Sequence, residues 1–269
     1  MAKRILILEG NTPDRALRAQ EALGLSPAAE YAAALKAEAP GLETVIAAPY
    51  FDDFDADAYD LTAFDGMAVT GSGVEWSGAD ERARPFWEMY EKAFAAGTPA
   101  FGSCWGVQTA AVALGGHTQA GPNGVEKAVA RAVEPVGDHP MTNGRRSAFD
   151  VLCMHRDDVT RLPEGAVVTA TNAHTAVQAF AYDAGDVSFW GVQYHPEVTL
   201  ETVAYWLNRP GPAWDKAEAA RAKAFARIAE DPAANASLAV KFGVNLDLLD
   251  GPYHRTELRN WLSDRVGAI

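Results

Sequence analysis

Short apolar runs alternate with longer amphipathic stretches through the first half of the chain. The runs have the length of buried strands, whereas the stretches between them carry apolar residues at helical spacing. Strands are predicted at residues 3–8, 44–48, 66–70 and 99–103, and helices at 14–39, with an interruption near Ser26 and Pro27, at 81–96 and at 107–114. This strand-helix-strand order predicts an α/β fold with a central, mostly parallel sheet.

Beyond Val125 the pattern changes to shorter β-rich runs, which predict antiparallel additions and a return of the chain to the central sheet. These runs lie at residues 149–154, 166–171, 177–182 and 187–194. After Leu207 the sequence NRPGP interrupts the pattern, and three helix candidates follow at 214–228, 232–242 and 255–266. We therefore predict one catalytic domain over residues 1–207 and a helical C-terminal extension over 208–269, packed on the core or on another subunit.

Charge, apolar content and cysteine number limit the kinds of partner and the cellular location that we expect. Lysine and arginine total 23 against 36 acidic residues, which gives a formal charge of −13, and the chain has no basic run. We therefore expect no nucleic-acid partner. No apolar run is long enough for a secretory signal or a membrane span, so we expect no membrane partner and a cytoplasmic location. The two cysteines, Cys104 and Cys153, match no disulfide framework or metal motif, so we expect free thiols and no metal.

Cys104 lies at the junction between the strand predicted at 99–103 and the helix predicted at 107–114. Gly102 and Gly106 flank it at two residues on either side, in the sequence GSCWGVQ over residues 102–108. Small residues at these positions are typical of a nucleophile elbow, because larger side chains would collide with the neighbouring strand or helix. The backbone N–H of Trp105 can then donate to an oxyanion, and the helix N-terminus favours a thiolate.

A second cluster, GVQYHPE over residues 191–197, ends the strand predicted from Val187. If this segment is extended, His195 and Glu197 point the same way, because side chains two apart share one face of a strand. A thiol needs a general base, and the base needs a group that fixes its tautomer and direction. Cys104, His195 and Glu197 are therefore predicted to form a catalytic triad.

Together, GSCWGVQ and GVQYHPE resemble the class I glutamine amidotransferases, whose pattern is GxCxGxQ followed much later by a His-x-Glu pair. The resemblance covers about residues 66–207, and the order of strands extends it to the N-terminus. The sequence HRD at 155–157 with LP at 162–163 is similar to the HGD…LP stretch of the GMP-synthetase-like branch, with Arg156 in place of glycine. This family implies a flavodoxin-like three-layer sandwich.

The resemblance also implies the reaction. Cys104 would attack the γ-carboxamide of glutamine, His195 would protonate the departing ammonia, and water would hydrolyse the γ-glutamyl thioester, without metal or cofactor. A second oxyanion donor would come from Gly71 and Ser72, in a loop where the family carries Gly-Gly-Pro. Gln108 is predicted to support either the elbow or the glutamyl group, and His155 to serve as a structural partner or a substrate contact.

Three functions follow from these residues. The first is a stand-alone glutamine amidotransferase that releases ammonia, with a separate synthetase subunit as a partner because no nucleotide-binding loop follows residue 207. The second is a γ-glutamyl peptidase acting on small γ-glutamyl amides or peptides, since the Gly71-Ser72 pair resembles stand-alone enzymes of that type. The third is a catalytically silent regulatory or binding protein. A homo-oligomer is compatible with all three.

Overall fold

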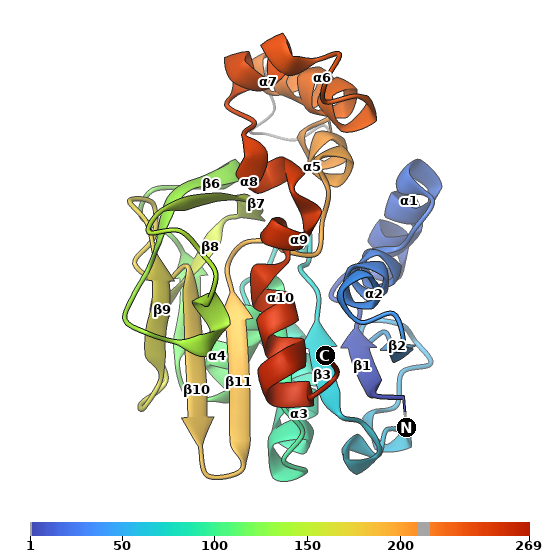
Figure 1. Ribbon diagram of the computed structural model, residues 1–269. Helices are drawn as coiled ribbons and strands as arrows, with labels where there is room; N and C mark the ends of the chain where they lie inside the picture. Colours follow the sequence, from blue (N-terminus) through green and yellow to red (C-terminus); the bar gives the residue numbers. More distant parts are fainter. Residues whose placement is uncertain (1, 209–215) are drawn as a thin grey trace.

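The computed structural model describes residues 2–208 and 216–269 and shows a central sheet with helices on both faces (Figure 1). The sheet has nine strands in the order β2-β1-β3-β4-β11-β10-β9-β6-β7. Its strands are β1 (Arg4–Leu8), β2 (Glu43–Ala47), β3 (Gly66–Val69), β4 (Ala100–Ser103), β6 (Glu126–Pro135), β7 (Phe149–His155), β9 (Val167–Thr171), β10 (Ala179–Ala184) and β11 (Val187–Val192). A separate two-stranded sheet pairs β5 (His117–Ala120) with β8 (Asp157–Arg161).

The sheet is parallel in its first half and antiparallel in its second. Strands β2, β1, β3, β4 and β11 run parallel to one another. Strands β10, β9, β6 and β7 continue the sheet in antiparallel pairings. The return of the chain to the central sheet is therefore β11, which pairs with β4, as the sequence predicted. It ends at Val192, two residues earlier than expected.

Helices cover the two faces of the sheet. Helices α3 (Arg84–Ala95) and α4 (Trp105–Ala113) pack through one hydrophobic cluster on one face, and α2 (Pro27–Glu38) packs through another on the opposite face. Helix α1 (Pro13–Leu23) ends before α2 because Pro27 occupies the first turn of α2 and the Ser26 side chain accepts a hydrogen bond from the Ala29 N–H. The interruption predicted near these residues is thereby explained.

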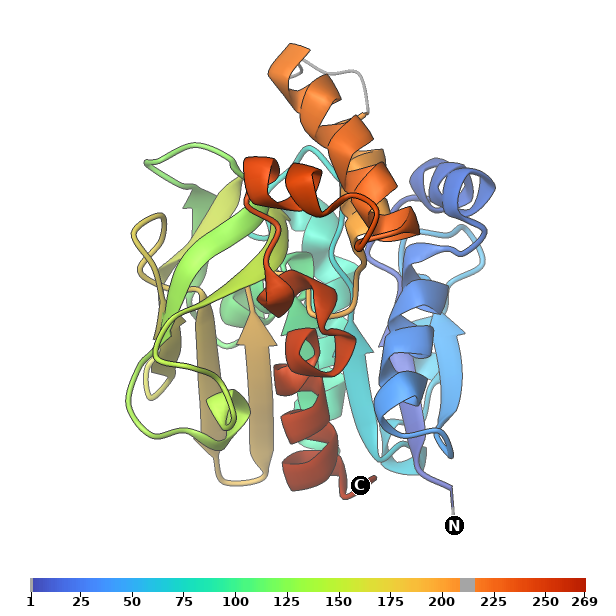
Figure 2. The same cartoon turned by 45° about the horizontal axis from the view of Figure 1, so that its top comes forward.

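The C-terminal segment is helical and folds back over the sheet (Figure 2). It contains α6 (Lys216–Glu230), α7 (Ala236–Phe242), α8 (Leu246–Leu249), α9 (Gly251–His254), α10 (Thr256–Trp261) and a π-turn (Leu262–Val266). Residues 209–212 of the predicted break, and the first two residues of the helix expected at 214–228, lie outside the described residues. The helix expected at 232–242 begins only at Ala236.

The C-terminal helices pack on the core of this chain in two places. Helix α10 shares a hydrophobic cluster with α2 and the sheet, whereas α6 packs on α5 (Leu200–Leu207). An ion pair between Arg145 and Glu257, both fully buried, ties α10 to the loop that connects β6 and β7. Removing one partner of such a pair costs roughly 3–5 kcal/mol, because the other charge stays buried. The division of the chain at residue 207 stays a prediction.

Among residues 2–208 and 216–269, no helix combines the length and the apolar content needed to cross a membrane.

Candidate active site

Two adjacent parallel strands bring the two sequence motifs together. Gly102 in β4 lies opposite Gly191 in β11, and Ser103 lies opposite Val192. The Cys104 N–H donates to the carbonyl oxygen of Val192 at 2.8 Å. Because neighbouring parallel strands end at the same edge of a sheet, the segments that carry Cys104 and His195 leave the sheet side by side.

The backbone at Cys104 has the strained conformation of a nucleophile elbow. Its φ of 51° and ψ of −102° lie outside the regions that residues with a side chain normally occupy. The turn is possible because Gly102 and Gly106 lack side chains: a Cβ on Gly102 would lie 2.5 Å from the Gly106 carbonyl carbon, and a Cβ on Gly106 would lie 2.5 Å from the Val69 oxygen. Helix α4 begins at Trp105, two residues earlier than predicted, so Cys104 occupies its N-cap position.

His195 and Glu197 form a buried pair. The Nδ1 of His195 lies 2.7 Å from Oε1 of Glu197, and both side chains are 4% exposed. The backbone from Gln193 to Glu197 consists of a bend and a turn. The expectation of an extended segment is therefore wrong, because β11 ends at Val192 and the chain turns at Pro196. The turn, rather than strand alternation, brings the carboxylate to the ring.

The electrostatics of the pair favour a protonated imidazole. Burial lowers the pKa of His195, but the charge of Glu197, together with the charge and hydrogen bonding of Cys104, outweighs it and raises the pKa to about 10. An imidazolium at this position is an acid that can protonate a departing amine. In the structure the Cys104 sulfur also lies 3.6 Å from the carbonyl oxygen of Met154.

Contacts on several sides fix the position of His195. Its ring centroid is 4.8 Å from that of Trp206, and a Cβ on Gly71 would lie 2.4 Å from its Cε1. Its backbone N–H donates to the Leu152 carbonyl at 2.8 Å, and its carbonyl accepts from Nε2 of His254 at 2.9 Å. Burial and the charge of Arg145 lower the pKa of His254 to about 3, so this histidine is a neutral donor at physiological pH.

The loop that carries Gly71 and Ser72 is held by two polar residues that the sequence reasoning missed. The side-chain oxygen of Asn11 accepts from the Gly73 N–H at 2.9 Å, and its amide nitrogen donates to Glu9 at 2.8 Å. Burial raises the pKa of Glu9. Their position in the sequence could have indicated them, because both lie within three residues of the end of β1, at the edge where β4 and β11 also end. The backbone groups of Gly71, Ser72 and Trp105 remain predicted oxyanion donors.

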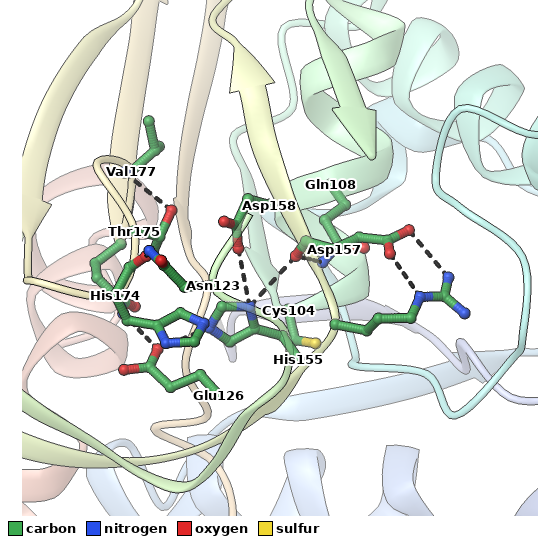
Figure 3. Close-up of polar contacts among 12 residues, drawn as sticks. Cys104, Gln108, Asn123, Glu126, His155, Asp157, Asp158, His174, Thr175 and Val177 are labelled. Atoms are coloured by element: carbon green, nitrogen blue, oxygen red, sulfur yellow. Dashed lines mark hydrogen bonds and ion pairs between the residues drawn. The ribbon is translucent and has the colours of Figure 1, made fainter. Parts of the chain in front are cut away.

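His155 lies in a second buried carboxylate cluster, on β7 (Figure 3). Its Nε2 is 2.8 Å from Glu126 and its Nδ1 is 3.2 Å from Asp158. Burial lowers the pKa of His155, but hydrogen bonds to Asp158 and Glu126 outweigh it and raise the pKa to about 9. Gln178 and Asn172 also donate to Glu126. Because both ring nitrogens contact protein carboxylates, a direct contact with substrate would have to displace one of them.

Gln108 and Trp105, both in the first turn of α4, contact other parts of the protein. The Gln108 amide donates to the carbonyl of Asp157 at 2.8 Å, which ties the elbow helix to β8 (Figure 3). Trp105 is buried and packs edge-on against Phe86, with ring centroids 5.9 Å apart. At the position where the related sequences carry glycine, Arg156 pairs with Asp157 and donates to the Glu75 carbonyl. Roles of Gln108 and His155 toward substrate stay predictions.

A cavity of about 300 Å³ lies beside His195. It is walled by α1, α2, α5, the loop of Gly71 and Ser72, and the turn after β11. Its lining residues are Asn11, Arg15, Ala19, Leu23, Leu25, Pro27, Glu30, Thr70, Gly71, Ser72, Gly73, Met154, His195, Glu197, Val198, Thr202, Tyr205 and Trp206. No group of three or more histidine, cysteine or acidic side chains suited to a metal ion occurs within the described ranges.

Comparison with known proteins gives the same family that the two sequence motifs resemble. The model of the glutamine amidotransferase class-I family matches residues 44–207. A γ-glutamyl-L-1-hydroxyisopropylamide hydrolase of a Pseudomonas species is 38% identical over 206 residues, which are 73% of this chain and 68% of that enzyme. A glutamine-hydrolysing GMP synthase of Escherichia coli is 39% identical over 114 residues, 39% of this chain but only 21% of that protein.

Solved structures agree with the fold. A glutamine amidotransferase from Thermotoga maritima superposes with a TM-score of 0.67 at 17% identity and covers 99% of both chains. A second, from Methylobacillus flagellatus, has the same TM-score and identity over 98% of this chain and 95% of its own. The family match spans more than half of the chain and includes both motifs. The chain therefore belongs to the class I glutamine amidotransferase family.

Proposed function

We propose that this enzyme hydrolyses the γ-amide bond of a γ-glutamyl substrate through a thioester on Cys104. The observation that carries the proposal is the pairing of a strained Cys104, at the end of β4, with a buried His195 after the adjacent β11 whose Nδ1 is fixed by Glu197 at 2.7 Å. With Nδ1 bound to Glu197, Nε2 is the nitrogen available to exchange a proton with sulfur and substrate. Glu197 holds the tautomer and stabilises the imidazolium.

In the first half of the reaction, the Cys104 sulfur forms a bond to the γ-carbonyl carbon, and the thiol proton resides on Nε2 of His195. The carbonyl oxygen becomes an oxyanion, which the Trp105 N–H and an N–H of Gly71 or Ser72 stabilise. His195 then gives its proton to the amide nitrogen, the carbon–nitrogen bond breaks, and the amine leaves. A γ-glutamyl thioester remains on Cys104.

In the second half, His195 takes a proton from water as the water oxygen attacks the thioester carbon. The carbon–sulfur bond breaks, the proton returns to sulfur, and glutamate is released. The pKa of His195, raised to about 10, suits its role as the acid that protonates the leaving amine at neutral pH.

Glutamine is the simplest substrate of this chemistry, and its leaving group is ammonia. N-substituted γ-glutamyl amides are a second candidate class, favoured by the 38% identity over most of this chain to a protein named as a γ-glutamyl-L-1-hydroxyisopropylamide hydrolase. The bond broken and the residues used are the same in both cases. The two classes differ only in the group that departs on the nitrogen.

The proposed partners follow from the leaving group. For glutamine, a separate synthetase subunit would consume the ammonia, in line with the similarity to a glutamine-hydrolysing GMP synthase. For a substituted amide, no second protein is required. A homo-oligomer and a cytoplasmic location remain expectations. The hypothesis of a silent regulatory or binding protein loses support, because the chain carries a cysteine at a strained turn and a histidine whose Nδ1 lies 2.7 Å from a carboxylate.

The test is turnover by the purified protein with glutamine and with a γ-glutamyl alkylamide, scored by release of ammonia, amine and glutamate. Wild-type protein should release glutamate from at least one substrate, and Cys104→Ala should abolish that release. Cys153→Ala is the matched control, because Cys153 is the second buried free cysteine of the described chain and lies on β7 rather than at the elbow. Equal turnover by Cys104→Ala and wild type would contradict the proposal.

A further inference from the structure

The cavity borders His195, the residue that must protonate the departing nitrogen. The nitrogen that leaves takes its proton from His195, so at that moment it lies against the imidazole. His195, Glu197, Gly71 and Ser72 all line the cavity, whereas Cys104 does not, so the cavity meets the site at the histidine and at the loop of Gly71 and Ser72. A substituent on the departing nitrogen that extends past His195 enters this cavity.

The size of the cavity exceeds what departing ammonia requires. Ammonia is about as large as water, which takes up about 30 Å³ in the liquid. The cavity holds about 300 Å³. A space of this size falls at the lower end of the range for small-molecule sites, which is about 300–1,000 Å³. It suits a small organic group and is many times larger than ammonia.

Part of the cavity wall is apolar, beside polar lining residues such as Arg15, Thr202 and Tyr205. Ala19 and Leu23 of α1 lie four residues apart and present one face of the helix, and Val198 and Trp206 contribute apolar surface next to the catalytic turn. Leu25 adds to the wall between α1 and α2. Apolar surface of this kind favours an aliphatic group over a polar one.

The charges in the cavity disfavour a carboxylate on the departing group. Glu30 and Glu197 both line it, and burial together with the charge of Glu197 raises the pKa of Glu30 to about 7. The same environment would penalise a further carboxylate brought in by substrate. The lining cation Arg15 lies 3.5 Å from Glu75, whose side chain is 87% exposed, and such a surface ion pair offsets only part of its charge. An amine that carries a carboxylate, as in a γ-glutamyl peptide, fits this site poorly.

We propose that this cavity binds the amine portion of an N-substituted γ-glutamyl amide, and that the group it takes is short, aliphatic and uncharged. The inference rests on the proposed hydrolysis at Cys104 and adds where the departing group binds. Helices α1, α2 and α5 thereby determine the substrate specificity. The elbow and the loop of Gly71 and Ser72 carry out the hydrolysis itself.

The first test compares kcat/KM of the full-length protein for three substrates: glutamine, γ-glutamylisopropylamide and γ-glutamylglycine. The last two leave with groups of similar size, one uncharged and one with a carboxylate. We expect the isopropylamide to exceed γ-glutamylglycine at least tenfold. Preference for γ-glutamylglycine would overturn the assigned ligand class.

The second test fills the cavity. Ala19→Leu adds a side chain at a lining position that is 7% exposed, and we expect the ratio of kcat/KM for the isopropylamide to that for glutamine to fall at least tenfold. Ala22→Leu is the matched control, because Ala22 is exposed on the same helix. Leu23→Trp provides a second way to fill the space if Ala19→Leu does not fold.

The outcomes separate the two proposals. An unchanged ratio in a folded Ala19→Leu or Leu23→Trp protein, with normal turnover of glutamine, would overturn the subsite and leave the function at Cys104 intact. Absence of turnover of all three substrates by wild type, with no acyl group on Cys104, would instead overturn the proposed function.

Discussion

Two buried histidines interact with Cys104, yet only one is arranged to transfer its proton. His195 has one nitrogen bound to one carboxylate, Glu197, and borders a cavity. His155 has both nitrogens bound to carboxylates, Glu126 and Asp158, inside a hydrogen-bonded network. In both cases neighbouring charges raise the pKa, to about 10 and about 9. A raised pKa therefore does not show which histidine is the catalytic base. The distinguishing feature is Nε2 of His195, which no carboxylate of the described residues occupies and which can exchange a proton with the sulfur.

The comparison also shows why one histidine is a switchable group and the other is not. A single carboxylate orients a ring and still lets its far nitrogen gain and lose a proton. Two carboxylates on opposite sides hold a ring as a cation, so it acts as a fixed charge and a structural link between β6, β7 and β8. Substitutions in the His195 cluster should therefore affect mainly catalysis, whereas substitutions in the His155 cluster should affect mainly stability.

The largest expected difference is between the two histidines themselves. His195→Asn should lower kcat by at least about 10³-fold, because the proton acceptor and donor for both half-reactions is removed. His155→Asn should lower kcat much less, by about tenfold or below, because no proton passes through that ring. Steady-state kinetics with the best substrate measures both. A loss of similar size in the two variants would remove the distinction between them.

The second-largest effect is expected from substitution of Glu197, the carboxylate that pairs with His195. Glu197→Gln should lower kcat by about 10²–10⁴-fold, because the amide no longer holds the tautomer that leaves Nε2 free to accept and no longer stabilises the imidazolium. The upper pH limit of kcat should move down from near 10, because the charge of Glu197 is one of the causes that raise the pKa of His195. A pH–rate profile of wild type and variant measures this. An unshifted limit would mean that Glu197 does not act through His195.

A smaller effect is expected from the C-terminal helices, through a positioning residue. His254 donates to the His195 carbonyl, so His254→Ala should lower kcat about tenfold with KM little changed, because His195 moves while the glutamyl site does not. His254→Gln should recover part of the loss, since its amide can also donate. A purely structural role would lower thermal stability and leave the kcat per folded molecule unchanged.

The smallest effect concerns stability at the His155 cluster. The pKa of His155 is raised in the folded state, from 6.5 to about 9. The pair of His155 and Glu126 therefore stabilises the fold fully below pH 6.5, and this contribution is lost as the pH rises through about 9. Glu126→Gln should therefore reduce the free energy of unfolding by about 1.5–3 kcal/mol at pH 6 and by less at pH 9.5. Denaturant unfolding at the two pH values tests the sign, and a difference that grows with pH would contradict it.

The sequence predicted the parts of the site that depend on local backbone geometry. Gly102 and Gly106 around Cys104 indicated the elbow because both positions exclude a Cβ, and the alternation of strands with helices indicated the parallel sheet. The turn at Pro196 was misread as extended, since a strand that stops two residues early leaves no mark in a short apolar run.

The parts that depend on tertiary packing could not be predicted in the same way. Ala19 and Leu23 look like ordinary helix residues, and they become a cavity wall only because α1 lies against α5, far along the chain. The four-residue helices α8 and α9 are too short to show a helical period. Strand β6 was not singled out because charged side chains interrupt its apolar positions. Asn11 matters only through its contact with Gly73.

The most direct test of the account is labelling by the diazoketone analogue of glutamine, which alkylates a nucleophilic sulfur and loses N₂. Peptide mass spectrometry identifies the modified residue, and the labelling rates of histidine variants give the dependence on each histidine. We predict one adduct per chain on Cys104, formed at similar rates in wild type and His155→Asn and at least about 10²-fold more slowly in His195→Asn. An adduct on Cys153, or equal rates in the two histidine variants, would contradict the assignment of His195 as the base.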